Sequence, residues 1–158
     1  MEQRTVRAFA ARVQSNELGP SVQVRYRISG GMPSQRVDCK VTMDSVGGAR
    51  VSRFDARVSD QVEHELIPPE ILDVPALLEA VSRGLYSLTS VDERVNQLPD
   101  GLVGSLTIVV DGEEESFHFL PEQEQRNVED RTIAPSMDDA LQRFWNIARG
   151  GTHEKGRS

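Results

Sequence analysis

Apolar and polar residues alternate most regularly in residues 22–28, near the start of the chain. The apolar side of this pattern holds Val22, Val24, Tyr26 and Ile28, and the polar side holds Gln23, Arg25 and Arg27. Because successive side chains of a strand point to opposite faces of the sheet, the pattern predicts a half-buried strand with a basic outer face. Such a pattern is typical of an antiparallel sheet that has one solvated side.

Four further segments have the pattern of strands, although it is less regular. They are residues 36–43, 49–56, 102–110 and 116–120. Asp111 and Gly112 lie between the last two, and an Asp-Gly pair between strands is a strong signal for a type I′ hairpin. Residues 57–67 show no clear pattern, and the polar residues 89–101 predict a loop.

Residues 74–84 have the spacing of the main helix. Their apolar stripe, which extends one residue beyond this range, consists of Leu77, Leu78, Val81 and Leu85. Asp73 is the expected N-cap and Pro75 falls in the first turn, where a proline is tolerated. Gly84 is the expected C-terminal residue of this helix.

The two ends of the chain also contain apolar residues at helical spacing. Residues 136–149 predict an amphipathic helix, with an apolar face formed by Met137, Ala140, Leu141, Phe144 and Ile147 or Ala148. Residues 1–19 fit either a short helix or a mobile arm, because Val6, Phe9 and Val13 share one helical face.

These elements predict an α+β fold, with an antiparallel sheet of four to five strands, one main helix packed on it and an additional C-terminal helix. The pattern does not determine the strand order. The expected organisation is an N-terminal arm or short helix at 1–19, an α+β core domain at 20–120, a polar linker at 121–135, a C-terminal helix at 136–149 and a disordered tail at 150–158.

Composition narrows the classes of partner. The formal net charge of the 158 residues is −7, which argues against general binding to nucleic-acid phosphates, since that needs a basic surface. The single cysteine, Cys39, cannot form an intramolecular disulfide and suits a reducing, cytoplasmic location. No apolar run approaches the roughly 18 residues that a membrane-spanning helix needs. We therefore expect a cytoplasmic protein that binds neither nucleic acid nor membrane.

Residues with catalytic or metal-binding chemistry are scattered along the sequence. Cys39 lies on the apolar side of a predicted strand, where a thiol is usually a small buried hydrophobe. Adjacent side chains of the VEHEL stretch (residues 62–66) would point apart, which disfavours a metal site. The glutamates at 113–115 follow a hairpin tip and read as a solvated charge run. We expect no catalytic residue, metal or cofactor; an enzyme would need His64 or His118 beside another titratable group in a cleft.

Two features are candidates for contact with another protein. The SGGMPS stretch (residues 29–34) lacks the dinucleotide-binding and P-loop patterns, and its glycines predict a hairpin loop with positive φ. Gly30, Gly31 and Met32 would form its rigid, partly apolar tip.

The second candidate is the pair Phe144 and Trp145 in the C-terminal helix. That helix folds back on the sheet, docks on a second subunit or enters a partner's groove. Folding back is the default, because one face of the sheet must be covered. The oligomeric state stays open at this point.

Three stretches, RYRISGGM, VPALLEAVSRGL and GSLTIVVDGEEESFHF, carry a resemblance to a known family. Together they resemble the emfourin family, small bacterial proteins first recognised as inhibitors of thermolysin-like metalloproteases such as protealysin. The resemblance covers about residues 22–120 and implies a functional surface that includes Gly30, Gly31 and Met32. The sequence departs from the family at Met32-Pro33, where members often have an aromatic and then a small residue.

Two functional hypotheses follow. The first is a non-enzymatic protein-binding module, with inhibition of a metalloprotease as the role that the resemblance implies. The second is a structural or regulatory subunit of a larger bacterial assembly, which docks through its C-terminal helix.

Overall fold

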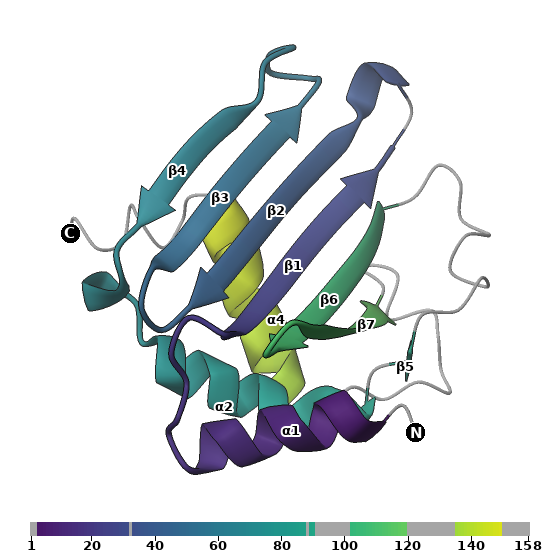
Figure 1. Ribbon diagram of the computed structural model, residues 1–158. Coiled ribbons are helices and arrows are strands. Elements are labelled where there is room, and N and C mark those ends of the chain that lie inside the picture. The colour runs from purple at the N-terminus through teal and green to yellow at the C-terminus, as the bar shows by residue number, and fades with distance from the viewer. Residues whose placement is uncertain (1–2, 32, 88, 91–101, 120–134, 150–158) are drawn as a thin grey trace.

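The fold is α+β, as predicted, and the computed structural model describes residues 3–31, 33–87, 89–90, 102–119 and 135–149. The described strands form one antiparallel sheet in the order β4-β3-β2-β1-β6-β7-β5 (Figure 1). Their bounds are β1 (Val22–Gly30), β2 (Val37–Asp44), β3 (Gly48–Asp55), β4 (Glu63–Ile67), β5 (Thr89–Ser90), β6 (Leu102–Val110) and β7 (Glu113–Phe119).

The seven-stranded sheet is wider than the four to five strands predicted from the sequence. The five predicted strands are present as β1, β2, β3, β6 and β7, whereas the two edge strands β4 and β5 were missed. Ile67 is the only buried side chain of β4, so alternating burial does not mark that strand. β5 has only two residues and lies in the segment expected to be a loop.

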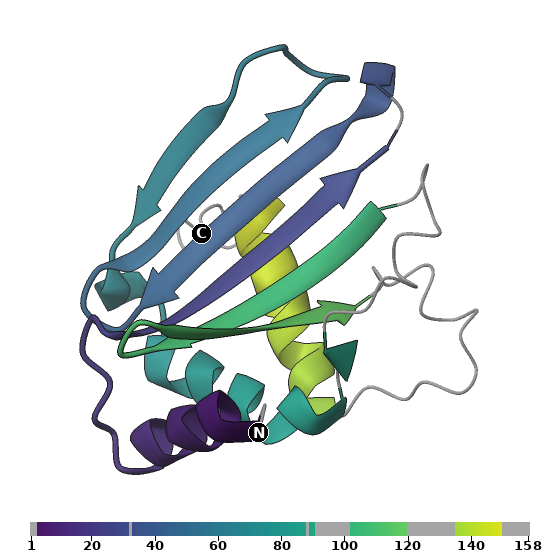
Figure 2. The same ribbon diagram turned by 45° about the vertical axis from the view of Figure 1, so that its right-hand side comes forward.

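Three of the described helices cover one face of this sheet (Figures 1 and 2): α1 (Gln3–Gln14), α2 (Val74–Gly84) and α4 (Pro135–Arg149). The N-terminal residues are thus a helix rather than an arm, with Phe9 fully buried. The expected N-cap of α2 is confirmed, because the Asp73 carboxylate accepts a hydrogen bond from the backbone N–H of Ala76 at 3.3 Å. The helix predicted at 136–149 is α4, while the other residues of the predicted linker and tail lie outside the described part of the chain.

Three short 3₁₀ helices complete the described elements: η1 (Pro33–Gln35), η2 (Pro69–Ile71) and η3 (Leu85–Ser87). η2 lies directly before the main helix, α2. It follows Pro68, and the backbone N–H of Leu72 closes it by donating to the carbonyl of Pro69 at 3.2 Å. The turn therefore redirects the chain from the edge of the sheet into α2.

The centre of the core is an aromatic stack around Tyr26 of β1. The Tyr26 ring lies 5.7 Å from the ring of Phe119 and 5.1 Å from that of Phe144, measured between centroids. These contacts join β1, β7 and α4 in one apolar layer. Burial, followed by the nearby Cys39 thiol, raises the pKa of Tyr26, so its phenol stays neutral.

The outer face of the sheet is polar, in agreement with the predicted basic outer face of the first strand. Arg25 and Arg27 are exposed there and form ion pairs with Glu114 and Asp38, respectively. No described helix covers this face, and the apolar core cluster lies on the other side of the sheet (Figure 2). Val109, opposite Gln23 on the outer face, is nevertheless buried.

The C-terminal end of α4 is fixed to the sheet by Arg53 of β3. Its guanidinium donates to the backbone carbonyls of Ala148 and Ile147, and it also forms an ion pair with Glu65 of β4 at 2.6 Å. The side chains of Arg53 and Glu65 are about 20% exposed. A cation at a helix C-terminus satisfies carbonyls that have no partner within the helix and complements the helix dipole.

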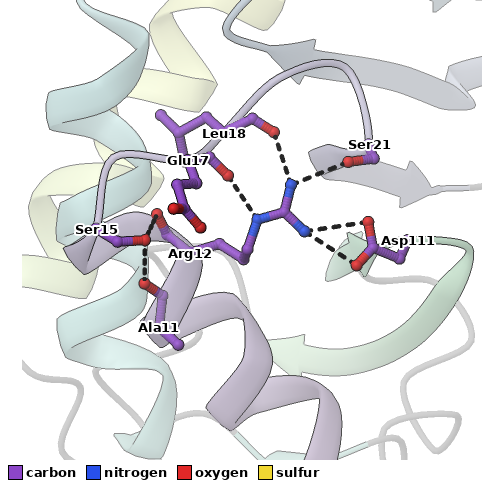
Figure 3. Close-up of polar contacts among 7 residues, drawn as sticks. All are labelled: Ala11, Arg12, Ser15, Glu17, Leu18, Ser21 and Asp111. Carbon is purple, nitrogen blue, oxygen red and sulfur yellow. Dashed lines mark hydrogen bonds and ion pairs between the residues drawn. The ribbon is translucent and has the colours of Figure 1, made fainter.

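Arg12 fixes the other terminal helix, α1, to the β6–β7 turn (Figure 3). Its guanidinium donates to the carbonyl of Glu17 at 2.6 Å, to the Ser21 hydroxyl at 3.2 Å and to both oxygens of Asp111 at 2.9 and 3.1 Å. Asp111 also donates its backbone N–H to the carbonyl of Ser21 at 3.0 Å. The hydrogen bond from Arg12, followed by the one from Ser21, lowers the pKa of Asp111.

Gly84 should be intolerant of a side chain, because α4 crosses α2 there. A Cβ atom would overlap the Cβ of Met137 and lie 2.8 Å from its backbone nitrogen. We expect Gly84→Ala to lower the free energy of unfolding by about 1–3 kcal/mol through overpacking, measured by urea denaturation. Gly47→Ala is the matched control, since its Cβ would lie 3.5 Å from an oxygen of Asp44, an ordinary contact. Equal urea midpoints for the two variants would contradict the close helix crossing.

Asp111→Asn should lower the melting temperature near pH 7, and this loss should shrink as the pH falls below about 4. The folded-state pKa of Asp111 is depressed, so its stabilising effect is present above the unfolded-state pKa and is lost as the pH falls through the folded-state pKa. Asparagine suits this position, because Asp111 has φ 51° and asparagine tolerates that region. In an Arg12→Gln background the same substitution should have little effect. A loss that is independent of pH would contradict the carboxylate's role.

Candidate functional site

The loop between β1 and β2 is held in a shape that requires glycine. Gly30 has φ 140° and Gly31 has φ 95°, and η1 follows before β2 begins. A Cβ atom on Gly31 would lie 2.8 Å from the backbone carbonyl oxygen of Gln35, so the loop closes tightly on itself. The predicted hairpin loop with positive φ is therefore confirmed, whereas Met32 lies outside the described residues.

A second loop, residues 56–62 between β3 and β4, lies beside the glycine loop at the same end of the sheet (Figures 1 and 2). The backbone N–H of Ala56 donates to the carbonyl of Arg36 at 2.8 Å and joins the two loops. Val58 is 77% exposed and Val62 is 49% exposed, although both are apolar. We call residues 30–36 and 56–62 the distal loop pair, because α1 and α2 lie towards the other end of the sheet.

An ion pair stiffens the second loop at its start. Both carboxylate oxygens of Asp55 accept from the Arg57 guanidinium, at 3.0 and 2.8 Å, and the backbone N–H of Arg57 also donates to Asp55 at 3.0 Å. The side-chain hydrogen bond from Arg57 is the main cause that lowers the pKa of Asp55. Val58 thus stands on a turn that has its own internal bonds.

The structure places the two C-terminal candidates differently. Phe144 is 0% exposed within the core, so it is not available to a partner in this fold. Trp145 is half-buried against the core, with the guanidinium of Arg149 over its ring at 5.4 Å. The helix has folded back on the sheet, which was the default expectation, and its apolar face is occupied.

The candidate catalytic groups do not converge. Cys39 is buried, and this burial is the main cause that raises the pKa of its thiol, so the thiol stays protonated. His64 is exposed on the outer face of β4, and His118 is half-buried on the outer face of β7. Among the described residues, no group of three or more His, Cys, Asp or Glu side chains is placed to hold a metal ion.

The glutamates after the β6–β7 turn, expected to form a solvated charge run, make separate contacts. Glu113 pairs with Arg4 of α1 at 3.1 Å, and Glu114 pairs with Arg25 of β1 at 3.2 Å. All four side chains are about half exposed or more, so these pairs contribute little to stability. They do not bring two carboxylates to one point.

An open groove of about 580 Å³ lies between α1 and α2. Its titratable residues, Glu79 and Arg83, come from the same helix, and its lining includes neither histidine nor cysteine. Neither His64 nor His118 lines this groove.

β4 and the exposed apolar residues on it and beside it were not predicted from the sequence. Val62 and Leu66 lie in the stretch where no pattern was recognised, and Leu66 is 67% exposed at an edge of the sheet. The available signal was a valine and a leucine four residues apart with a histidine midway, which is the alternation of a strand. Because the apolar side of β4 faces solvent rather than the core, burial arguments do not identify it.

Comparison with known proteins leaves the emfourin resemblance as a prediction. No protein-family model matches the chain, and no curated protein matches it. Among the described helices, none is long and apolar enough to cross a membrane.

Gly31→Ala should destabilise the protein more than Gly19→Ala. Both glycines have positive φ, but a Cβ on Gly19 would meet open space, whereas one on Gly31 would press on the Gln35 carbonyl. We expect backbone strain to lower the free energy of unfolding by about 1–2 kcal/mol at either site, with a further loss at Gly31 alone. Urea denaturation of both variants measures the difference. If the two losses are equal, the glycine loop relaxes without cost and is not rigid.

Proposed function

We propose that this chain is a non-enzymatic protein-binding module that contacts its partner through the distal loop pair. The observation that carries the proposal is the exposure of Val58 and Val62 beside a glycine loop that closes on its own backbone. Exposed apolar side chains that gather at one place are typical of a contact surface, and binding residues are found disproportionately on loops held by a rigid scaffold.

The loop geometry suits tight contact with a protein surface. A loop whose conformation is already fixed loses little conformational entropy when it binds, so more of its contact energy appears as affinity. Arg36 and Asp60 are exposed in the same loops and add charges of both signs around the valines. Such charges favour one orientation of the partner over others.

The specific role that we propose is inhibition of a thermolysin-like metalloprotease. This role rests on the emfourin resemblance, which includes Gly30, Gly31 and Met32 in the functional surface. A rigid loop tip that occupies the substrate cleft would block access without taking part in chemistry. We further propose a cytoplasmic location, supported by the free, buried thiol of Cys39.

The proposal predicts that substitutions in the distal loop pair weaken binding without loss of folding. We expect the wild-type chain to inhibit cleavage of a fluorogenic peptide by a thermolysin-like metalloprotease, and Met32→Ala and Val58→Asp to raise the inhibition constant about tenfold or more. Val46→Asp is the matched control, because Val46 is an exposed valine in the β2–β3 turn, at the opposite end of the sheet.

Two results would count against the proposal in different ways. If the wild-type chain does not inhibit the protease, the proposed protease role is wrong. The binding role is then tested by affinity capture of a partner from the native host. Inhibition or capture that is equal for Val58→Asp, Met32→Ala and Val46→Asp would show that the contact surface lies elsewhere. Circular dichroism and urea denaturation of each variant exclude a loss of folding as the cause.

A further inference from the structure

β4 is an edge strand, and no described segment pairs with its outer side. In the strand order β4-β3-β2-β1-β6-β7-β5, β4 pairs only with β3, through residues from Glu63↔Arg53 to Ile67↔Ala49. Alternate backbone N–H and C=O groups of such a strand point away from the sheet and are free to bond another strand. Figure 1 shows β4 along the margin of the sheet, clear of α1, α2 and α4 on its outer side.

The side chains of β4 divide by chemistry between the two faces. Leu66 and His64 lie on the outer face, and Val62 continues that line just before the strand begins. Glu63 and Glu65 lie on the inner face, where Glu65 bonds Arg53. A strand added beside β4 would therefore meet apolar side chains mainly on one face and carboxylates on the other.

Two copies of β4 cannot pair well with each other. In an antiparallel two-fold pair, the registers centred on Glu63, His64 or Glu65 each place carboxylates directly opposite one another, which is destabilising. The register centred on Leu66 pairs only a few residues and then reaches Pro68, which has no N–H to donate. The edge can thus pair with a strand whose composition differs from that of β4, whereas pairing with a second copy of β4 is unfavourable.

Charge complementarity defines that composition. Residues 58–82 contain no lysine or arginine, and the acidic residues in this span are Asp60, Glu63, Glu65, Glu70, Asp73 and Glu79. β4 itself carries Glu63 and Glu65 on its inner face and no lysine or arginine, while the basic residues across from it on β3 are Arg50, opposite Leu66, and Arg53, opposite Glu63. A basic side chain on the inner face of an added strand therefore meets carboxylates, and an acidic one is repelled. The favoured occupant is therefore an extended segment that alternates apolar and basic residues, with its apolar side facing Val62 and Leu66.

We propose that β4 is a docking edge for an extended segment of a partner protein that alternates apolar and basic residues and adds to the sheet as an eighth strand. Main-chain hydrogen bonds supply the affinity in this mode of binding, and alternate side chains supply the specificity. The inference rests on the proposed protein-binding role but names a surface that the distal loop pair does not include, apart from the flanking Val62.

The test uses synthetic peptides and the full-length chain. The probe is a short peptide that alternates lysine and valine, and the comparisons are the same peptide with glutamate for lysine and a version methylated at alternate backbone nitrogens. We expect the lysine–valine peptide to bind, by fluorescence anisotropy, and to slow hydrogen exchange at the amides of β4. Both comparison peptides should bind much more weakly.

Leu66→Lys provides the matched variant in the protein. We expect it to weaken binding of the lysine–valine peptide about fivefold or more, because it removes an apolar cross-strand contact and adds a positive charge at an edge that binds a positively charged peptide. Tyr86→Lys makes the same charge change at an exposed aromatic residue after α2 and should leave binding unchanged. Both positions are more than half exposed, so folding should survive both changes.

Four results would overturn the proposal: no binding of the lysine–valine peptide, binding that survives backbone methylation, equal binding of the glutamate–valine peptide, or dimers of the free chain that protect β4 from exchange. The last would identify a second copy as the occupant. None of these results bears on the proposed role of the distal loop pair. Conversely, if Val58→Asp and Met32→Ala do not weaken binding of a partner, the peptide result is unaffected. The two proposals can therefore fail separately.

Discussion

The fold depends on covering one face of β1, the central strand of the sheet. Its inward residues are fully or almost fully buried, and Tyr26 stacks between Phe119 and Phe144. Because a sheet face of this width must be buried on something, the chain supplies helices from both of its ends, α1 and α4, together with α2 between them. The polar bonds of Arg12 and Arg53 then fix the ends of the two terminal helices.

Since α1, α2 and α4 all lie on one side of the sheet, their placement determines which surfaces of the described residues remain for binding. The apolar face of α4 is buried in the core, so a partner cannot contact Phe144 without unfolding the layer that holds β1 in place. The surfaces that remain include the outer face, the loops at the distal end and the free edge at β4. Contacts at these places leave the core intact. For this reason both proposed binding surfaces lie on the β3–β4 hairpin and the adjacent β1–β2 loop.

Sequence patterns predicted those elements whose signals are local. Asp73 marks the start of α2, Asp111 and Gly112 mark a hairpin, and the alternation of β1 follows from burial on one side. The pattern of β4 was not recognised, since Ile67 is its only buried residue and Leu66 faces solvent. Nor could spacing alone tell that Phe144 meets Tyr26, or that Arg53 binds carbonyls in α4, because those contacts join segments about a hundred residues apart. The alternation of Val62, His64 and Leu66 was visible, but it is informative only once β4 is known to be an edge.

The acidic residues of β4 would then serve the free and the bound protein in different ways. In the free chain, carboxylates at the inner-face positions make every extensive self-pairing of the edge unfavourable, which protects an exposed apolar strand from aggregation. In a complex, the same carboxylates favour a basic segment and reject an acidic one, so protection and selectivity come from one set of charges. Arg53 limits this effect at Glu65, because it already bonds that carboxylate from the inner face. Selectivity should therefore depend mainly on Glu63, the inner-face position at the start of β4, next to the distal loop pair.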